Sequence, residues 1–358
     1  MTSDQHYEVV SKLKPGRIII PIILGLAVVA WFILKEIDTD VLNQLNFTWR
    51  SVFWLFVAWC CMIGRDLGYM IRLKILSKND LNWRQAFKVI MLWEFTSAIS
   101  PSTVGGTALA VVFIHKEKIS VGRSTSIVLA TSFLDELYFV IMFPVILLFV
   151  GGNTLFRTTL HGTGIAFLDN LVFIAVAGYT IILAWVLLVG YGLFIDPVKI
   201  KKTIIWLFSL PVLKRWKESA EKAGDDIVKS SHELKGQKFT FWLKALIATF
   251  LSWTSRYWVA NAILVAFFSV TDHFLIFARQ LVIWIMMIIS PTPGGSGLAE
   301  MILGRYISDA IPADIASVGS LALAIAIIWR IISYYPYLII GASIVPGWIE
   351  RNFVRKKQ

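Results

Sequence analysis

Charged residues are scarce in this sequence. Asp, Glu, Lys and Arg make up 16% of its 358 residues, whereas hydrophobic residues make up 57%. Soluble domains usually carry about 25% charged residues. The shortage of charge therefore excludes an ordinary soluble domain and indicates a membrane protein with several spanning helices. The net charge of +11 lies in segments between apolar runs, which is typical of cytoplasmic loops and requires no nucleic-acid partner.

Cysteine and histidine are scarce as well. The two cysteines, Cys60 and Cys61, are adjacent in an apolar run, so they offer neither a disulfide framework nor metal-ligand spacing. The five histidines are scattered outside the apolar runs. The sequence also lacks a Walker, GxSxG or HExxH signature. We therefore expect no cofactor, no metal, no catalytic residue and no enzymatic activity.

Long apolar runs predict the membrane-spanning helices. The run at 18–34 follows several basic residues, as a signal peptide would, but it is long enough to span and lacks a small-residue cleavage site. We interpret it as a retained first helix. The six predicted spans lie at about 18–34, 51–75, 124–150, 171–194, 241–268 and within 314–345.

Two similar sequences interrupt apolar runs. SPSTVGGTALA occupies 100–110 and SPTPGGSGLAE occupies 290–300. Proline and paired glycine end helices. The apolar segment after the first sequence, 107–114, would rise only about 12 Å as a helix, against a hydrocarbon core of about 30 Å. Each sequence therefore predicts the tip of a re-entrant helical hairpin, one over 85–114 and one over 274–303.

Lysine and arginine predict the orientation. The N-terminal tail, the segments 72–88, 115–123 and 195–245, and the C-terminal tail are basic. Six spans and two hairpins place all these segments on one side, which the positive-inside rule identifies as the cytoplasm. We therefore expect both termini in the cytoplasm. The segments poor in Lys and Arg are 35–50, 151–170, 269–273 and 304–314.

The predicted fold class is an all-α integral membrane protein, a polytopic bundle with an inverted-topology repeat. Each half has three spans and one hairpin, and because three is odd the second half is inverted. Arg65 lies 35 residues before Ser100, and Arg256 lies 34 residues before Ser290, which supports the repeat. The predicted parts of this single membrane domain, 1–358, are a first repeat at 18–150, a linker at 195–238, and a second repeat at 171–194 and 239–345.

The linker at 195–238 alternates apolar residues with lysines. This pattern predicts one or two amphipathic helices on the cytoplasmic surface, broken at Pro211. Two interpretations stay open: a basic linker that fixes the topology, and a surface that binds anionic headgroups.

Ionisable residues inside predicted spans are costly, about 2.5–3.5 kcal/mol each on insertion scales. Arginines and acids near the middle of several spans predict buried pairing around a polar cavity that binds a headgroup. The alternative is a set of ion pairs that only fix helix positions. The residues concerned are Arg65, Asp66, Asp135, Glu136, Arg256, Glu300 and Arg330.

The hairpin tips predict an anion site. A helix that begins after a glycine pair presents free N–H groups and the positive end of its dipole. Two such ends, entering from opposite faces, would meet near the midplane, where a phosphate fits. The alternative is a helix break that only aids packing. The tip residues are Ser100, Pro101, Gly105, Gly106, Ser290, Pro291, Pro293, Gly294 and Gly295.

The paired SPSTVGG and SPTPGGSGLAE sequences, the acidic pair Asp135-Glu136 and the segment WRIISYYP at 329–336 resemble the transmembrane, flippase-like region of lysylphosphatidylglycerol synthases. The resemblance covers about 15–345. It implies a multi-pass protein of a bacterial or archaeal cytoplasmic membrane that moves lipids between leaflets.

In two-part members of that family, a C-terminal cytosolic domain makes the aminoacyl lipid. This chain resembles a stand-alone membrane part without the synthase domain. The resemblance matches Gly294, Gly295 and Glu300 to the family's second loop, and Arg330 with Tyr334 to its late helix. Tyr334 thereby joins the predicted cavity.

Three functions fit these patterns. The first is a lipid translocase for a phospholipid or a lipid-linked headgroup. The second is a secondary transporter of a small anion, and the third is a membrane enzyme or enzyme partner acting on a lipid-linked phosphate or sugar. The expected partners are anionic or aminoacylated phospholipids or polyprenyl-linked lipids, a separate lipid-modifying enzyme, and a second copy of the chain.

Overall fold

The computed structural model describes residues 45, 47–100, 103–157, 171–209, 217–287, 298–311, 318–349 and 351, and within this part of the chain the only regular structure is helical. The predicted first span at 18–34 lies outside the described residues. The helices are α4 (Trp49–Leu76), α5 (Trp83–Ile99), α6 (Thr103–Lys116), α7 (Val121–Val150), α8 (Gly152–Phe156), α10 (Leu171–Phe194), α11 (Pro197–Leu207), α12 (Lys217–Leu234), α13 (Phe239–Phe267), α14 (His273–Met287), α15 (Leu298–Ile307), η3 (Ser308–Ala310), α16 (Val318–Ser333) and α17 (Tyr335–Ile349).

Four helical stretches in the described residues are long and apolar enough to cross a membrane: α4, α7, α10 and the combined 318–349. The outward face of α4 exposes Phe53, Phe56 and Ile63 at helical spacing, each more than half exposed. Such a face is costly in water and suited to lipid. The chain is therefore an all-α integral membrane protein.

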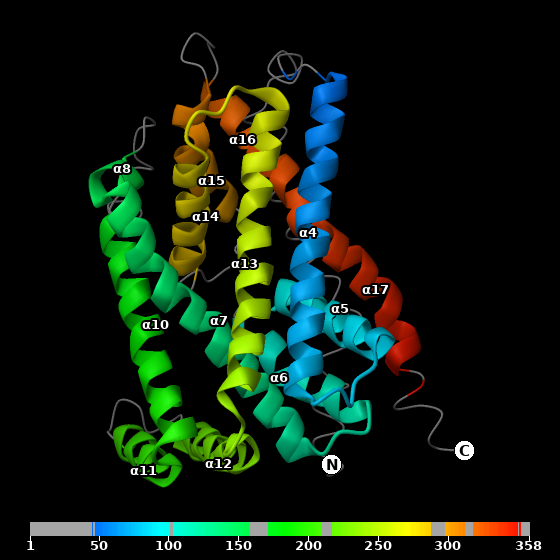
Figure 1. Cartoon of the computed structure of the whole chain (residues 1–358), viewed down its shortest axis with the longest axis vertical. Helices are drawn as coiled ribbons and strands as arrows, with labels where there is room; N and C mark the ends of the chain where they lie inside the picture. The colour runs from blue at the N-terminus through cyan, green and yellow to red at the C-terminus, as the bar shows by residue number, and fades with distance from the viewer. Residues whose placement is uncertain are drawn as a thin grey trace.

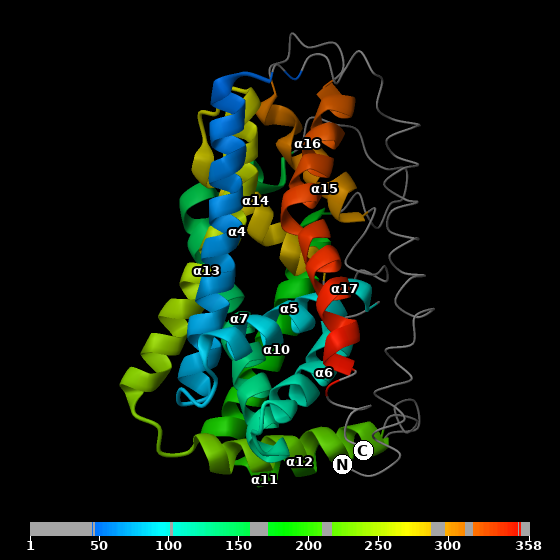
Figure 2. The ribbon, with the colours of Figure 1, turned by 90° about the vertical axis from the view of Figure 1, so that its right-hand side faces the viewer.

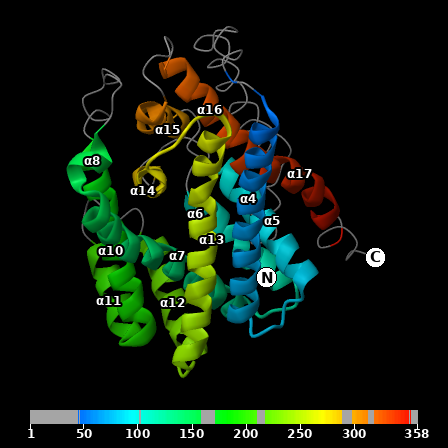
Figure 3. The same ribbon diagram turned by 45° about the horizontal axis from the view of Figure 1, so that its top comes forward.

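Helices α4 and α13 form the most extensive contact between any two described elements, and they lie side by side in Figures 1 and 3. Gly68 allows this approach, because a Cβ atom there would lie 2.9 Å from the Ala248 carbonyl oxygen and 2.9 Å from Ser252. Gly64 similarly faces Ser255. Small residues four apart let membrane helices pack closely, and Gly64 and Gly68 have this spacing.

Two pairs of short helices occupy opposite ends of the bundle. The pair α5 and α6 lies in the lower half of Figures 1 and 2, and the pair α14 and α15 lies in the upper half. Helix α5 has 17 residues, or about 25 Å of rise, and α15 has 10, or about 15 Å. Neither length reaches the roughly 30 Å of a hydrocarbon core. The two pairs coincide with the predicted hairpins at 85–114 and 274–303.

Within the first pair, the structure corrects the expected start of the second arm. Helix α6 begins at Thr103, so Gly105 and Gly106 lie in its first turn rather than before it. Gly106 is needed for packing, since a Cβ atom there would lie 2.8 Å from the Ser97 backbone of α5. This glycine therefore lets the two arms approach each other.

The linker forms two helices, α11 and α12, which Figure 1 shows at the lower end of the bundle. Asp196 accepts a hydrogen bond from the Lys199 N–H at the start of α11. Lys201 of α11 then bonds Asp225 of α12. Helix α11 exposes Trp206, 68% accessible, beside exposed Lys202, so its outer face is both apolar and basic. Pro211 lies outside the described residues.

The last span is interrupted rather than continuous. Helix α16 ends at Ser333 and α17 begins at Tyr335. Pro336 explains the interruption, because it lacks the N–H that would bond to Ile332 in an unbroken helix. The interruption lies directly beside Tyr334, one of the predicted cavity residues.

One prediction about charge was wrong. Arg72 was counted with the basic segment at 72–88, but α4 continues to Leu76 and buries Arg72 at 3% accessibility. A buried partner holds it there, as described below. The rest of this segment, between α4 and α5, and the basic segment between α6 and α7 lie at the lower end of Figure 1, as do α11 and α12.

Candidate functional site

Arg65 lies near the middle of α4 and is 1% accessible. Its Nη1 donates to Asp66 at 2.9 Å, and its Nη2 pairs with Glu94 of α5. The guanidinium also lies over the ring of Tyr69 at 4.6 Å and the ring of Tyr337 at 4.9 Å. Two carboxylates and two aromatic faces therefore compensate a charge that would be very costly alone in a bilayer.

The same cluster connects four helices. Tyr337 of α17 donates its hydroxyl hydrogen to both Asp66 carboxylate oxygens, at 2.9 and 3.0 Å. Ser252 of α13 donates to the Arg65 carbonyl at 2.7 Å. The Arg65 cluster thus links α4, α5, α13 and α17.

A second ion pair joins α4 to the middle of α7. Arg72 donates to both oxygens of Asp135, the Nη2–Oδ2 distance being 3.0 Å, and to the Thr249 hydroxyl at 3.0 Å. The Trp253 indole N–H also donates to Asp135. A bidentate arginine with a further donor satisfies most of the lone pairs of this carboxylate. Asp135 is one of the predicted cavity residues, but both of its carboxylate oxygens are engaged by Arg72 and Trp253.

A third ion pair joins α15 to α16. Arg330 donates through Nε to the Glu300 carboxylate at 2.8 Å, and both side chains are buried. The Arg330 guanidinium lies over the Tyr334 ring at 4.7 Å. Tyr334 in turn donates to the Ala98 carbonyl at 2.9 Å, two residues before the first tip. These three predicted residues therefore lie together and bridge the two helix pairs.

Arg256 differs from the other central arginines. It lies near the middle of α13, is half-buried, and holds its guanidinium 5.7 Å from the Trp253 ring centre and 5.2 Å from that of Trp284. Among the described residues no carboxylate lies within ion-pairing distance. Aromatic faces position a cation without neutralising it. Arg256 is thus a central arginine with aromatic neighbours and no ion-pair partner among the described residues.

Glu136 follows Asp135 on α7 and is not engaged in the same way. Its Oε2 atom is buried, and within the described part of the chain it has no hydrogen-bond partner. The Tyr257 hydroxyl, on α13 beside Arg256, is also buried without a partner there. The structure therefore leaves one carboxylate and one guanidinium uncompensated near the centre of the bundle.

The hairpin-tip residues can be placed only in part. Ser100 caps the C-terminus of α5, with its N–H donating to the Thr96 carbonyl. Gly105 and Gly106 lie in the first turn of α6. The other predicted tip residues, Pro101, Ser290, Pro291, Pro293, Gly294 and Gly295, lie outside the described residues.

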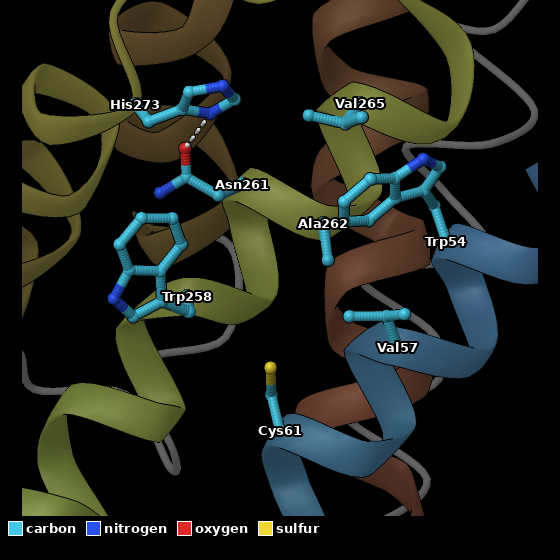
Figure 4. A pocket seen from close by; sticks show the side chains of 8 residues that line it. All are labelled: Trp54, Val57, Cys61, Trp258, Asn261, Ala262, Val265 and His273. Atoms are coloured by element: carbon cyan, nitrogen blue, oxygen red, sulfur yellow. Dashed lines mark hydrogen bonds between the residues drawn. The ribbon is translucent and has the colours of Figure 1, made fainter.

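A pocket of about 250 Å³ lies between α4 and α13, near the upper ends of both helices (Figure 4). Asn261 and His273 form its polar side, with 3.2 Å between Asn261 Oδ1 and His273 Nδ1. Val57 and Cys61 line the side toward the middle of α4, as Figure 4 shows. Apart from Asn261 and His273 at one end, the lining is apolar. Its walls are Trp54, Val57, Cys61, Trp258, Asn261, Ala262, Val265 and His273.

No group of three His, Cys, Asp or Glu side chains in the described ranges is arranged to hold a metal ion. At the upper end, Arg279 bonds Asp309 and the carbonyls of Thr154, Arg157 and Tyr306. This arginine fastens α14 to α8 and α15, so its role is architectural.

Sequence reasoning missed several partners of the predicted residues. Arg72 was assigned to a loop because it lies at the edge of an apolar run, and Trp253 and Trp284 were not singled out. Gly64 and Gly68 carried a usable signal, since their four-residue spacing is typical of close helix pairs. The long-range pairings themselves have no local signature.

Comparison with known proteins identifies the family of this chain. The profile of the lysylphosphatidylglycerol synthase TM region matches residues 18–341. The chain belongs to this family. Membership agrees with the resemblance seen in the sequence and connects this membrane protein with lipid handling.

One relative of the chain is a UPF0104 membrane protein of Archaeoglobus fulgidus. It is 27% identical over 343 residues, which cover 92% of this chain and 96% of the relative. No solved structure matches the chain. The family is therefore established, and any cargo must be recognised by this chain's own residues.

Proposed function

We propose that this protein is a lipid translocase that moves a phospholipid or a lipid-linked headgroup between the leaflets of the membrane. The observation that carries the proposal is Arg256, a half-buried guanidinium held by two indole rings and facing no carboxylate among the described residues. An uncompensated cation at this depth is costly unless an anion visits it. A headgroup phosphate is such an anion.

The arrangement of the helices supports an alternating mechanism. Helices α4 and α13 run in opposite directions in Figure 1, and one short helix pair lies at each end of the bundle. Helix α7 packs against α14, and α17 packs against α5, so the last helix of each half contacts the hairpin of the other. We propose six spans, two re-entrant hairpins and an inverted repeat, with one half rocking against the other.

The basic segments support an orientation. The described basic segments, between α4 and α5, between α6 and α7, and in α11 and α12, lie at the lower end of Figure 1. We therefore propose that this end faces the cytoplasm, with both termini on that side of the cell membrane. The pocket between α4 and α13 would then lie in the outer leaflet. Its polar end at His273 points toward the outer surface and its apolar end toward the midplane, which matches the direction of a lipid chain in that leaflet.

The test is lipid transfer in reconstituted vesicles. Purified protein is inserted into unilamellar vesicles that carry a short-chain fluorescent phospholipid, and albumin extraction measures its transfer between leaflets. We expect Arg256→Ala to slow transfer about 10- to 100-fold, since a hydrogen bond to a charged group is worth about 1.5–3 kcal/mol. Arg256→Lys should keep part of the rate, because the charge remains.

Arg84→Ala is the matched control, since this exposed arginine at the start of α5 removes the same charge away from the centre. Arg330→Ala should also abolish transfer, but it leaves Glu300 unpaired, so its folding has to be checked separately. Normal transfer by folded Arg256→Ala and Arg330→Ala proteins would reject the cavity.

Native mass spectrometry in mild detergent gives a second, independent test by identifying the lipid that the protein retains. We expect a retained anionic or aminoacylated lipid, whose amount falls in Arg256→Ala. Gradient-driven uptake of a small anion without lipid transfer would instead favour a secondary transporter. Turnover of a labelled polyprenyl phosphate would favour an enzyme.

A further inference from the structure

The central charges fall into two groups. Arg65, Arg72 and Arg330 are each paired with at least one carboxylate. Glu136 remains: it is next to Asp135, yet it takes no part in the Arg72 pair, and its Oε2 is buried without a partner in the described structure. Both residues lie near the middle of α7, where water is scarce.

A carboxylate oxygen that is buried without a donor is costly, because that oxygen has lost its hydration and gained no hydrogen bond in exchange. The neighbouring charge of Asp135 adds repulsion, which Arg72 only partly offsets. A carboxyl group in such a place relieves the cost by binding a proton. Glu136 therefore differs from the paired acids in what it requires: a proton rather than an arginine.

A neighbouring cation or hydrogen-bond donor would relieve the same cost without a proton. Within the described residues of the elements that pack on α7, the ionisable groups nearest its middle are Asp135 itself, Arg72 and Tyr69 on α4, Arg256 and Tyr257 on α13, and Tyr179 on α10. On α14, Arg279 bonds Asp309 and His273 bonds Asn261, both at the upper end of the bundle. The charged residues of α6 and α12 lie at the lower end, away from the middle of α7. None of these groups donates a hydrogen bond to the buried Glu136 Oε2 atom, so nothing in this set replaces the proton.

We propose that Glu136 is a proton-binding site whose protonation is coupled to anion binding at Arg256. The carboxylate takes up one proton and changes from charge −1 to neutral. Glu136 and Arg256 lie near the middle of α7 and α13, which pack against each other there, the ring centres of Tyr138 and Tyr257 being 6.4 Å apart. While Glu136 is ionised, its negative charge repels a phosphate approaching Arg256. Once Glu136 is neutral that repulsion is gone.

The coupling is reciprocal: a bound phosphate favours the proton, and a bound proton favours the phosphate. A proton gradient can therefore bias the direction of transfer. This inference rests on the proposed function for its transport part only. The proton site itself stands on the geometry of α7 and can be tested without any lipid.

Infrared difference spectroscopy of the detergent-solubilised protein tests the proton site. The carbonyl band of a protonated carboxylic acid should change as the pH is stepped from about 5 to about 9, the range over which buried glutamates titrate. We expect the band to shift when glutamate is 13C-labelled and to vanish in Glu136→Gln. Glu117→Gln, a glutamate at the end of α6 that bonds Gln85, should keep it. A wild-type protein without the band, or a band that survives in Glu136→Gln, overturns the proposal.

The vesicle assay tests the coupling. Wild-type transfer should slow as pH rises, by up to about tenfold per pH unit through the titration of one proton. Glu136→Gln mimics the neutral acid, so its transfer at high pH should rise toward the wild-type rate at low pH and lose its dependence on pH. Transfer that follows the wild-type pH profile overturns the coupling, and so does transfer that falls at every pH, which would make Glu136 a ligand for a cationic headgroup. If the wild type moves no lipid while the infrared band behaves as expected, the proposed function fails and the proton site stands.

Discussion

Arg65 and Arg256 occupy similar places in the two halves of the chain and differ in their surroundings. Each lies near the middle of one of the two most closely packed helices, α4 and α13, and each precedes a Ser-Pro sequence by about the same distance. Arg65 is buried between Asp66, Glu94 and two tyrosine rings. Arg256 is half-buried between two indoles and faces no carboxylate in the described part of the chain.

The difference teaches how a membrane protein can use one residue type for two purposes. A compensated arginine holds helices together, because removing it would strand its partners. An uncompensated arginine adds little to stability and has the capacity to bind a ligand. The pairing, and not the position in the span, separates the two roles.

The largest effect should come from breaking the paired member. Arg65→Ala leaves Asp66 and Glu94 without their cation, and we expect a loss of about 3–5 kcal/mol in the free energy of unfolding. The midpoint of thermal unfolding in mild detergent, followed by tryptophan fluorescence, measures it. Arg256→Ala in the same assay should change the midpoint far less. Equal losses in the two variants would remove the distinction between the arginines.

The next effect should come from moving the two arginine-bearing helices apart. Gly68→Ala places a Cβ atom 2.9 Å from the Ala248 carbonyl oxygen and 2.9 Å from Ser252, so α4 has to shift against α13. We expect a cost of about 1–3 kcal/mol, as for other overpacked sites. Gly122→Ala is the control, since no atom lies within 4 Å of a Cβ there. The same unfolding assay compares them, and an unchanged midpoint in Gly68→Ala would show that the helices can yield.

A smaller effect, confined to transfer, should follow from filling the pocket beside α13. Val57→Phe occupies space between Val57, Cys61 and Ala262 that we assign to a lipid chain. We expect transfer to slow several-fold, less than tenfold and so less than about 1.4 kcal/mol, with an unchanged unfolding midpoint. Val52→Phe, at an exposed position on the same helix, is the control. Transfer at the wild-type rate would show that the pocket takes no part in the lipid transfer that we assign to Arg256.

The smallest effect is expected outside the spans, where water weakens ion pairing. The Lys201 ammonium donates a hydrogen bond to Asp225 and thereby lowers the pKa of that carboxyl below its ordinary value. Because the folded pKa is the lower one, the pair stabilises the protein above the unfolded pKa and loses this contribution as the pH falls through the folded pKa. Lys201→Ala should therefore lower the unfolding midpoint slightly at neutral pH and not at all in strong acid. Lys202→Ala, an exposed neighbour, should show no such pH dependence.

Much of the fold could be read from periodicity and composition. The runs at 51–75, 124–150 and 171–194 became α4, α7 and α10 with ends shifted by a few residues. The short segments around the two Ser-Pro sequences became helices too short to cross. The assignment failed at Arg72, because a charged residue at the edge of an apolar run looks the same whether it faces water or a buried carboxylate.

By itself, the sequence determined that the chain is a helical membrane protein of this family with costly charges in its spans. Those features depend on local properties: apolar runs, helix breakers and the positions of ionisable residues along each helix. Only the tertiary structure decided which charges compensate each other. Arg72 meets Asp135 and Arg65 meets Glu94 because helices distant along the chain pack together. Among the described residues, the same packing gives Glu136 and Arg256 no ion-pair partner. The energy of a buried charge depends on what lies within a few ångströms of it, and that distance is set by the packing of the helices.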